Sequence, residues 1–462
     1  MEAQVEVKNS QADAQLVPAG RQQAVLTSNG IVFADDLVKS DDISGLEDGG
    51  GTLLLLHAYP KLAAGCSGKG RRRYVCCELV FWAAPEAKVL WIASYRQLWG
   101  RHQLCRLMVV VNPFSGGRRG RQVWTDVVEP VFQQAGVSVE LVETTHAGHA
   151  VEIVRTRLAA LPGRAASLDG IVGIGGDGIL SEIVQGLIKH RFDPVRANLG
   201  LGEEDRYPAV GIIPAGTGNG FAASHLFAAG EDCTPLCAAL ALARARRAST
   251  DLALVTQQQV VYGSCLSWGW GLVSDTDIEA DDLRSLFGPL RTTLKGVHNI
   301  VRRRIYPGRL QLLQTARAPG ATPGWKTIEG NFWLVWAMAV THAATDLKVA
   351  PHKRHGDGSV DVIVMREGVT RAQMTYVFLQ LEKGAHIDAA YVEVYNVTQL
   401  IFEPLGDTGL VCIDGELSAA GSCPFFALWY AVTVLCLFCI ARTCECALGI
   451  RDEKFGSVYV RV

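Results

Sequence analysis

The sequence lacks an excess of charge of either sign. Its 44 lysines and arginines almost balance its 46 aspartates and glutamates, which leaves a formal net charge of −2 at pH 7. A surface that binds nucleic acid needs clustered positive charge, so this balance indicates no nucleic-acid partner. Residues 1–30 also lack the apolar run of a secretory signal peptide, because they are polar and rich in alanine and glutamine. We therefore expect a cytoplasmic protein.

A disulfide framework is absent too, although the chain has 13 cysteines. Most of them are scattered through the chain without the regular spacing of a disulfide-rich domain. We expect free thiols in a reducing compartment.

The chain is long enough for two or more domains, with 462 residues of which 49% are apolar and 19% charged. Residues 1–50 mix polar and acidic segments, and we expect disorder there, apart from a short strand at 30–38. Residues 51–100 hold apolar runs separated by glycine and "KGRRR", which predicts three short strands. This small β extension is either a regulatory or membrane-contacting module or a few strands packed on the main body.

Residues 105–250 show the alternation of an α/β domain. Apolar runs such as "CRLMVVVNP" and "YPAVGIIPAG" predict buried parallel strands, and the stretches between them predict helices at 121–135, 147–161, 179–190 and 218–228. The strands end in the loops "NPFSGG", "TTHAG", "GGDG" and "PAGTGN". Because ligands bind at the carboxyl ends of parallel strands, these loops indicate one shared binding edge.

Residues 251–422 change texture again. Strand-like runs follow one another with fewer helices between them, which predicts an antiparallel β domain.

The tail, residues 423–462, contains an uncharged apolar run at 424–441. As a helix this run would span roughly 27 Å, the low end for a membrane-spanning segment. Three interpretations stay open: a membrane helix followed by palmitoylated cysteines, a helix packed on the β domain, or a segment that is not native coding sequence. The cysteines at 436–446 are spaced too tightly for a standard zinc site.

A glycine fingerprint with an unexpected aspartate lies at 170–187. Gly173, Gly175 and Gly178 fit the G-x-G-x-x-G pattern of dinucleotide binding, but Asp177 stands between the last two. A carboxylate there repels a pyrophosphate, which argues against a dinucleotide-dependent oxidoreductase. The same carboxylate suits phosphoryl transfer, where it can hold magnesium or accept a proton from an attacking hydroxyl. The chain has no GxxxxGK[ST] loop, so it is not a P-loop enzyme.

The motifs "NPFSGG", "GGDGILSEIVQGL" and "GIIPAGTGNGFAAS", in this order, resemble the catalytic domain of the diacylglycerol kinase and sphingosine kinase superfamily. The segments "SWGWGLVSDTDIEADDLR", "DGSVDVIVMREGVTRAQ" and "VCIDGEL" narrow the resemblance to sphingosine kinases. It implies an α/β nucleotide-binding domain with a parallel sheet followed by an antiparallel β-sandwich domain. It also implies ATP and Mg²⁺ as cofactors, a sphingoid base as substrate, and association with an intracellular or plasma membrane surface.

The resemblance also assigns residues to the site. It makes Asp177 the catalytic carboxylate, which accepts the proton of the primary hydroxyl of the lipid. It assigns nucleotide contacts to Asn112, Pro113, Phe114, Thr144, Glu182, Gly216, Thr217, Gly218, Arg284, Arg291, Asp414, Gly415 and Glu416. It assigns substrate contacts to Gly175, Gly176, Gly178, Ser267 and Asp277, with Asp277 facing the ammonium group of the lipid.

Some of these assignments have plain structural alternatives. Thr145 and His146 replace an acidic–basic pair of the family in the second loop. Glu182 can be a solvated helix residue, Ser267 an ordinary strand serine, and the two arginines can pair with Asp281 and Asp282. At the level of function, a diacylglycerol or ceramide kinase and a non-catalytic lipid-binding protein remain alternatives. Neither of those lipids carries a free amine, so Asp277 argues against them.

Overall fold

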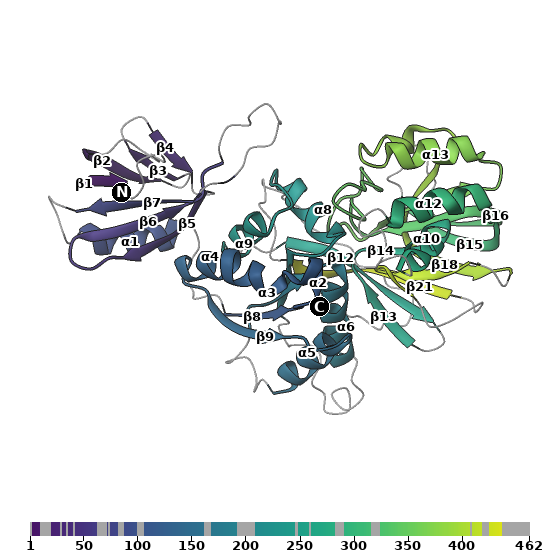
Figure 1. Cartoon of the computed structure of the whole chain (residues 1–462), viewed down its shortest axis with the longest axis horizontal. Coiled ribbons are helices and arrows are strands. Elements are labelled where there is room, and N and C mark those ends of the chain that lie inside the picture. Colours follow the sequence, from purple (N-terminus) through teal and green to yellow (C-terminus); the bar gives the residue numbers. More distant parts are fainter. Residues whose placement is uncertain are drawn as a thin grey trace.

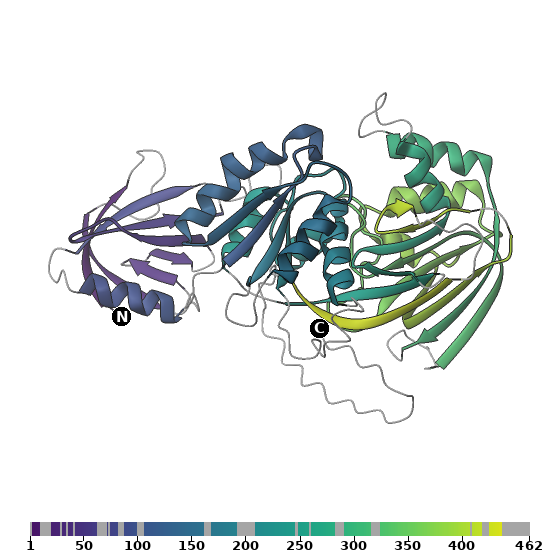
Figure 2. The same cartoon turned by 90° about the horizontal axis from the view of Figure 1, so that it is seen from below.

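The computed structural model describes the main body of the chain in segments. These are residues 2–9, 20–27, 30–33, 36–39, 42–61, 72, 74–81, 87–98, 106–160, 168–191, 208–244, 248–257, 260–281, 291–315, 324–406, 409–417 and 425–436. Three parts follow one another along the molecule: an N-terminal sheet, a central α/β domain and a β-rich domain (Figures 1 and 2).

The N-terminal part is a seven-stranded antiparallel sheet with the order β4-β3-β2-β1-β7-β6-β5. Its strands are β1 (Glu2–Asn9), β2 (Gly20–Thr27), β3 (Gly30–Phe33), β4 (Asp36–Lys39), β5 (Ile43–Asp48), β6 (Leu53–Ala58) and β7 (Val75–Val80). The expectation of disorder over residues 1–50 is therefore wrong where the structure describes them. Alternate residues such as Ala24 and Leu26, or Ile31 and Phe33, are buried, as in a strand with one face in the core. These alternating patterns are short, and the polar composition of residues 1–50 hides them in the sequence.

A helix, α1 (Ala87–Leu98), takes the place of the third strand expected in residues 51–100. Trp91 on this helix is fully buried and packs edge-on against Phe81, with ring centroids 5.7 Å apart. The run "VLWIAS" is apolar and short, so its pattern alone does not distinguish a strand from a helix that buries one face.

The central domain has a parallel sheet with the order β11-β10-β8-β9, as expected. Its strands are β8 (Arg106–Val111), β9 (Ser138–Glu143), β10 (Gly170–Gly175) and β11 (Ala209–Pro214). Its helices are α2 (Ser115–Arg118), α3 (Gly120–Val123), η2 (Trp124–Val128), α4 (Glu129–Gln134), α5 (His149–Ala159), α6 (Asp177–Arg191), α8 (Gly220–Ala228) and α9 (Pro235–Ala243). Helices α4 and α9 pack together, as do α5 and α6, on either side of the sheet (Figure 1).

The β-rich domain is antiparallel, which confirms the expectation for this part of the chain. Its strands are β12 (Ala248–Gln257), β13 (Val260–Ser264), β14 (Ser267–Gly271), β15 (Tyr306–Gln314), β16 (Gly324–Met338), β17 (Val360–Arg366), β18 (Glu393–Pro404), β19 (Val411–Ile413), β20 (Glu416–Leu417) and β21 (Phe425–Cys436). The helical elements α10 (Leu272–Asp281), α12 (Arg291–Arg302), α13 (Arg371–Gln380) and η5 (Ala385–Asp388) complete it.

The apolar tail forms strand β21, so the expectation of a helix is wrong over residues 425–436. The strand lies antiparallel to both β12 and β18, and its last residue, Cys436, also pairs in parallel with Val210 of β11. It thereby joins the two domains into one 14-stranded sheet. A long apolar run can form a buried strand as well as a helix. Here the run forms a strand because β12 and β18 offer it unpaired edges on both sides. Residues 437–462 lie outside the described part.

Among the described residues, no helix is both long and apolar enough to cross a membrane. In the part of the chain that the structure describes, Cys76, Cys77, Cys233, Cys237, Cys265 and Cys412 form no disulfide.

The N-terminal sheet docks on the central domain through a buried ion pair. Arg72 donates to both carboxylate oxygens of Glu231, which follows α8, at 3.0 and 2.5 Å, and to Asp42 at 2.7 Å. The side chains of Arg72 and Glu231 are only 4% and 8% exposed. A second contact joins Ser44 to Gln134 at the end of α4, with an Oγ–Oε1 distance of 3.0 Å. The extension is therefore packed on the main body, which was one of the two interpretations of residues 51–100.

Candidate active site

Asp177 lies at the carboxyl edge of the parallel sheet, as the first residue of α6 and two positions after β10. Its carboxylate accepts hydrogen bonds from the backbone N–H of Gly220 at 2.8 Å and of Phe221 at 3.1 Å. These two groups open helix α8, so Asp177 connects the "GGDG" loop to the helix that follows "PAGTGN". The expected catalytic carboxylate is thus placed between the two glycine-rich loops.

Burial raises the pKa of Asp177 from 3.8 to about 6. The N–H groups of Gly220 and Phe221 oppose this rise, because they stabilise the charged form, and the Asp414 carboxylate adds to it. A carboxylate with this pKa is ionised at neutral pH and is still a better proton acceptor than an exposed aspartate.

Two glycines allow these loops to touch. A Cβ on Gly216 would lie 2.4 Å from Cα of Gly176, and a Cβ on Gly116 would lie 2.0 Å from the carbonyl oxygen of Ala215. No side chain fits in either space. Close approach of backbone to backbone exposes N–H groups at the edge of the sheet, where they can bind phosphate oxygens.

The first loop follows β8. Asn112 donates its N–H to the carbonyl of Ile174 at 3.0 Å, and its side-chain oxygen accepts the N–H of Phe114 at the same distance. Pro113 lies between them, and the Phe114 side chain is 60% exposed. These three expected nucleotide residues therefore form one turn beside β10, in which the Asn112 side chain fixes the backbone.

The second loop follows β9, where Thr144 is buried and bonded through its N–H to the carbonyl of Val111 at 2.9 Å. Glu182, one turn into α6, accepts the N–H groups of Gly148 at 2.9 Å and Ala150 at 3.0 Å. Glu182 therefore caps the start of α5 and is not the solvated helix residue that was the alternative. Its contacts to the protein place it as a support of the second loop.

The "PAGTGN" loop is closed by a residue that the sequence reasoning did not single out. Asn219 has a positive φ of 58°, and its side chain accepts the N–H of Gly216 and donates to the carbonyl of the same residue, at 3.0 and 2.9 Å. This ring of bonds fixes the turn that contains Thr217 and Gly218. The asparagine at the end of the quoted motif was the signal that could have identified it, since asparagine tolerates a left-handed backbone.

The turn between β19 and β20 brings the β-rich domain to the site. A Cβ on Gly178 would lie 3.5 Å from Oε1 of Glu416, and a Cβ on Gly415 would lie 3.4 Å from Oδ2 of Asp277. Expected nucleotide and substrate residues from distant parts of the chain thus meet near Asp177. Gly178, Gly415, Glu416 and Asp277 form this meeting point.

Asp414, in the same turn, is bonded to the segment before β14. Its buried carboxylate accepts the hydroxyl of Ser264 at 2.7 Å and three backbone N–H groups, those of Cys265, Leu266 and Ser267, at 3.0–3.1 Å. The Asp414 side chain therefore braces the start of β14, and its expected contact to a nucleotide stays a prediction. Ser267 belongs to the same brace and is 9% exposed.

The remaining expected residues are placed in part. Asp277 is exposed and lies inside helix α10. Arg284 lies outside the described residues, and Arg291 begins α12, with its side chain also outside the description.

Among the described residues, no three or more histidine, cysteine, aspartate or glutamate side chains gather into a metal cluster. This arrangement is compatible with Mg²⁺, which usually binds one or two carboxylates together with substrate phosphates and water.

Comparison with known proteins supports the two-domain fold. The family described as "Diacylglycerol kinase catalytic domain" matches residues 106–255, and the family described as "YegS C-terminal NAD kinase beta sandwich-like domain" matches residues 273–436. The second match includes β21. A solved structure of a diacylglycerol kinase from Bacillus anthracis has a TM-score of 0.52 at 18% identity and covers 73% of this chain and 98% of that one. This similarity, with the family matches, confirms the expected two-domain fold.

Curated relatives narrow the family. Sphingosine kinase 1 of Arabidopsis thaliana is 29% identical and covers 73% of this chain and 74% of its own length. Sphingosine kinase 2 of Arabidopsis thaliana is 30% identical, with 68% and 69% covered. Sphingosine kinase 1 of Homo sapiens is 29% identical, with 68% and 86% covered. With the site geometry and both family matches, these similarities show that the chain is a lipid kinase and belongs to the sphingosine kinase family of the diacylglycerol kinase catalytic-domain superfamily.

Proposed function

We propose that this chain transfers the γ-phosphoryl group of ATP to the primary hydroxyl of a sphingoid base, giving a sphingoid base 1-phosphate. The observation that carries this proposal is the Asp177 carboxylate, held between two glycine-rich loops with its pKa raised by burial to about 6. A base beside loops that can bind phosphate is the arrangement that phosphoryl transfer to an alcohol needs.

In this proposal each group has a separate task. Asp177 accepts the proton of the attacking hydroxyl. Backbone N–H groups of the turns at 112–116 and 215–219 bind the phosphates, and Arg284 and Arg291 add positive charge. Mg²⁺, held mainly by the phosphates, would neutralise the charge that develops during transfer.

Asp277 is the proposed contact for the lipid ammonium group. It is an exposed carboxylate on α10, next to the Gly415–Glu416 turn that reaches the "GGDG" loop. A charge there favours an amine-bearing lipid over diacylglycerol or ceramide, which have no free amine. We place the Ser267 hydroxyl beside the polar head of the same lipid.

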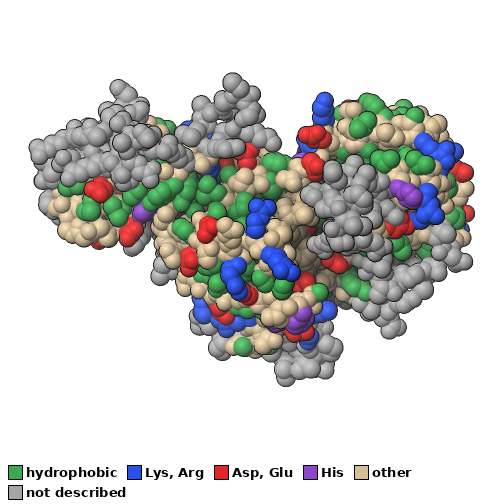
Figure 3. All heavy atoms as spheres, viewed as in Figure 1, with side chains coloured by type: hydrophobic (Ala, Val, Ile, Leu, Met, Phe, Trp, Pro, Cys, Tyr) green, Lys and Arg blue, Asp and Glu red, His purple; other side chains and the backbone are tan. Residues whose placement is uncertain are grey.

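We also propose that the enzyme works at the cytoplasmic face of a membrane, because its substrate resides there. Helices α12 and α13 contact each other through a hydrogen bond from Arg371 to the carbonyl of Val301, at 3.0 Å. Val301 is 62% exposed, and Leu379 on α13 is 72% exposed. The exposed arginines Arg302 and Arg371 accompany them, and apolar and basic side chains gather over this end of the molecule (Figure 3). Such a mixture suits an anionic lipid surface.

The experiment that tests the function is transfer of radiolabelled phosphate from ATP to a panel of lipids: sphingosine, phytosphingosine, diacylglycerol and ceramide. We expect product with the two sphingoid bases and little with the others. Preference for diacylglycerol or ceramide would replace the substrate assignment, and absence of transfer to every lipid would favour a binding protein.

The amine contact is tested on the same panel with Asp277→Asn. Loss of a charge-assisted hydrogen bond costs about 1.5–3 kcal/mol, so KM for sphingosine should rise by about one to two decades while KM for ATP changes little. Asp388→Asn, at an exposed carboxylate on η5 in the same domain, is the matched control. A rise in KM for ATP alone would assign Asp277 to the nucleotide side.

A further inference from the structure

The connection between β16 and β17, residues 339–359, reaches from the β-rich domain to the "PAGTGN" loop; we call it the 339–359 strap. Thr345 donates twice to the carbonyl of Gly218, through its backbone N–H and through its hydroxyl, both at 3.0 Å. Ala344 forms a β-bridge with Asn219. The strap therefore holds the same turn that the Asn219 side chain closes.

A second contact lies one turn further along α8. The backbone N–H of His342 donates to the hydroxyl of Ser224 at 2.9 Å, and that hydroxyl donates to the carbonyl of Gly220 at 2.8 Å. A Cβ on Gly220 would lie 2.5 Å from the carbonyl oxygen of Ala343, so the strap lies directly against the start of the helix. The strap thus contacts the chain on both sides of the N–H donors of Asp177, at Gly218 and Asn219 before them and at Ser224 after them.

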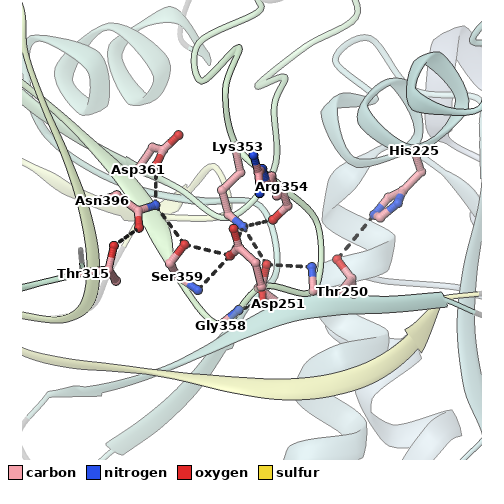
Figure 4. Close-up of polar contacts among 12 residues, drawn as sticks. His225, Thr250, Asp251, Thr315, Lys353, Arg354, Gly358, Ser359, Asp361 and Asn396 are labelled. Carbon is pink, nitrogen blue, oxygen red and sulfur yellow. Dashed lines mark hydrogen bonds and ion pairs between the residues drawn. The ribbon is translucent and has the colours of Figure 1, made fainter. Parts of the chain in front are cut away.

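The other end of the strap is fixed inside the β-rich domain. The Lys353 ammonium group is fully buried and pairs with Asp251 of β12 at 2.7 Å and with Asp357 at 2.9 Å. Asp251 also accepts the N–H groups of Gly356 and Gly358, at 2.9 and 2.8 Å. Figure 4 shows Lys353 enclosed by these partners, with His225 of α8 bonded to the neighbouring Thr250. A buried and fully bonded ion pair holds its geometry firmly, because either partner left alone would be an uncompensated charge.

We propose that Thr345 is a positioning residue for phosphoryl transfer: through Gly218 it holds the N–H groups of Gly220 and Phe221 on the Asp177 carboxylate, so that the β-rich domain orients the base of the catalytic domain. This inference rests on the function proposed above. Thr345 does not touch the reacting atoms and acts only through the loop. It lies far from the catalytic motifs in the sequence, and its role arises from the fold alone.

Loss of the Thr345 contact should change the pKa of Asp177 in a definite direction. The N–H groups of Gly220 and Phe221 lower the pKa of Asp177, against burial and the Asp414 carboxylate, which raise it. Other titratable groups at this place are Glu416 beside Gly178, Asp277 beside Gly415, and Cys233, a thiol whose pKa burial and the nearby Asp177 raise to about 12. These groups either repel the Asp177 charge or stay neutral. Loosening the loop therefore raises the pKa of Asp177 and moves the acid limb of the activity profile to higher pH.

The test compares Thr345→Val with Thr345→Ser in the full-length enzyme. Valine removes the hydroxyl donor and keeps the size and the backbone N–H, whereas serine keeps the donor. We expect Thr345→Val to lower kcat about three- to tenfold, the range for one lost neutral hydrogen bond, and to shift the acid limb upward by roughly half a pH unit. Thr345→Ser should restore both values.

The matched control is Thr341→Val, in the same strap, where the hydroxyl bonds to His342 and not to the "PAGTGN" loop. It should leave the pH profile unchanged. Ser224→Ala, which removes the second contact of the strap, should shift the acid limb in the same direction as Thr345→Val and keeps the test informative if that variant does not fold.

An unshifted acid limb in folded Thr345→Val, or in Ser224→Ala where Thr345→Val does not fold, would overturn the inference. A lower kcat with that limb unchanged would mean a general structural role. The proposed function fails separately: in that case the wild-type enzyme would show no acid limb near pH 6, or Asp177→Asn would remain active.

Discussion

The surroundings of Asp177 raise and lower its pKa at the same time. Burial and the Asp414 carboxylate disfavour its charge, and the two N–H groups at the start of α8 favour it. The balance leaves a pKa of about 6, above the value of 3.8 for an unperturbed aspartate. A raised pKa means that the ionised, proton-accepting form is fully present only well above pH 6 and is lost as the pH falls through that value.

We therefore expect the kcat of the wild-type enzyme to fall about tenfold for each pH unit below 6, as the base becomes protonated. Asp177→Asn should lose at least two orders of magnitude in kcat at neutral pH and retain most of its affinity for ATP. The measurements are pH–rate profiles and ATP binding by calorimetry. Activity within about threefold of the wild type would remove Asp177 from the mechanism.

Gly216 is the residue at which the smallest change should have a large effect. A single methyl group there would collide with the Gly176 backbone, because its Cβ would lie 2.4 Å from Cα of that residue. Gly216→Ala should separate the two loops and weaken ATP binding at least tenfold, and Gly216→Asp should weaken it further by adding negative charge beside the phosphates. Gly368→Ala, where a Cβ meets nothing within 4 Å, is the control. An unchanged dissociation constant for ATP in Gly216→Ala would contradict the placement of this loop.

At the scale of elements, the sequence predicted best where pattern and loop chemistry agree. The strands β8, β10 and β11 are continuous apolar runs that end in glycine-rich or asparagine-rich loops. Both features can be recognised in one sequence without an alignment. The N-terminal strands are short and mostly polar, so their pairing depends on partners that the sequence does not reveal. Helix α1 and strand β21 are apolar runs whose period does not distinguish helix from strand.

In the candidate site, too, some residues could be predicted from the sequence and others could not. Asp177 and Gly216 belong to motifs that end neighbouring parallel strands, so their proximity follows from the carboxyl edge of that sheet. Glu416 belongs to a motif of the β-rich domain, and its approach to Gly178 depends on how the two domains meet. The different surroundings of Asp414, bonded to Ser264, and Glu416, beside Gly178, depend on the direction in which each side chain leaves a tight turn. Thr345 could not be predicted, because its partner Gly218 lies in another domain.

The strand assignment of β21 leads to a prediction at this scale. Removing it would leave strands β12 and β18 without the partner that lies between them. A chain ending at residue 423 should therefore be insoluble or lose its cooperative unfolding transition, and a chain ending at residue 440, which retains β21, is the control. The comparison is made by calorimetry on both truncations. A stable and active chain ending at 423 would show that β21 is dispensable.

At the scale of the whole molecule, three parts lie in a row and the N-terminal sheet is attached to the α/β domain through few polar contacts. The Arg72–Glu231 pair is buried, with side chains 4% and 8% exposed, and it lies just beyond the end of α8. Since α8 begins at the N–H groups that hold Asp177, the docked sheet and the candidate base contact opposite ends of one helix.

Breaking this pair should release the N-terminal sheet. Arg72→Met leaves Glu231 and Asp42 without their cation, and the loss of one partner of a buried pair costs about 3–5 kcal/mol. We expect a lower thermal unfolding temperature and faster release of an N-terminal fragment in limited proteolysis. The double variant Arg72→Met/Glu231→Met should be less destabilised than the sum of the single variants. Arg309→Met, in a half-exposed pair with Glu329 and Glu403, is the control and should change little.

The position of β21 in the sheet has a consequence for how the enzyme is made. Two of its partners, β11 and β12, are synthesised long before it, and β11 belongs to the catalytic domain. Contacts between residues so distant in the chain form slowly and cannot form at all until the last strand has left the ribosome. We therefore expect the growing chain to expose the unpaired edge of β12 while the β-rich domain is synthesised, and to depend on chaperones during that time. Pulse-labelled chains should become resistant to protease only after synthesis of residue 436.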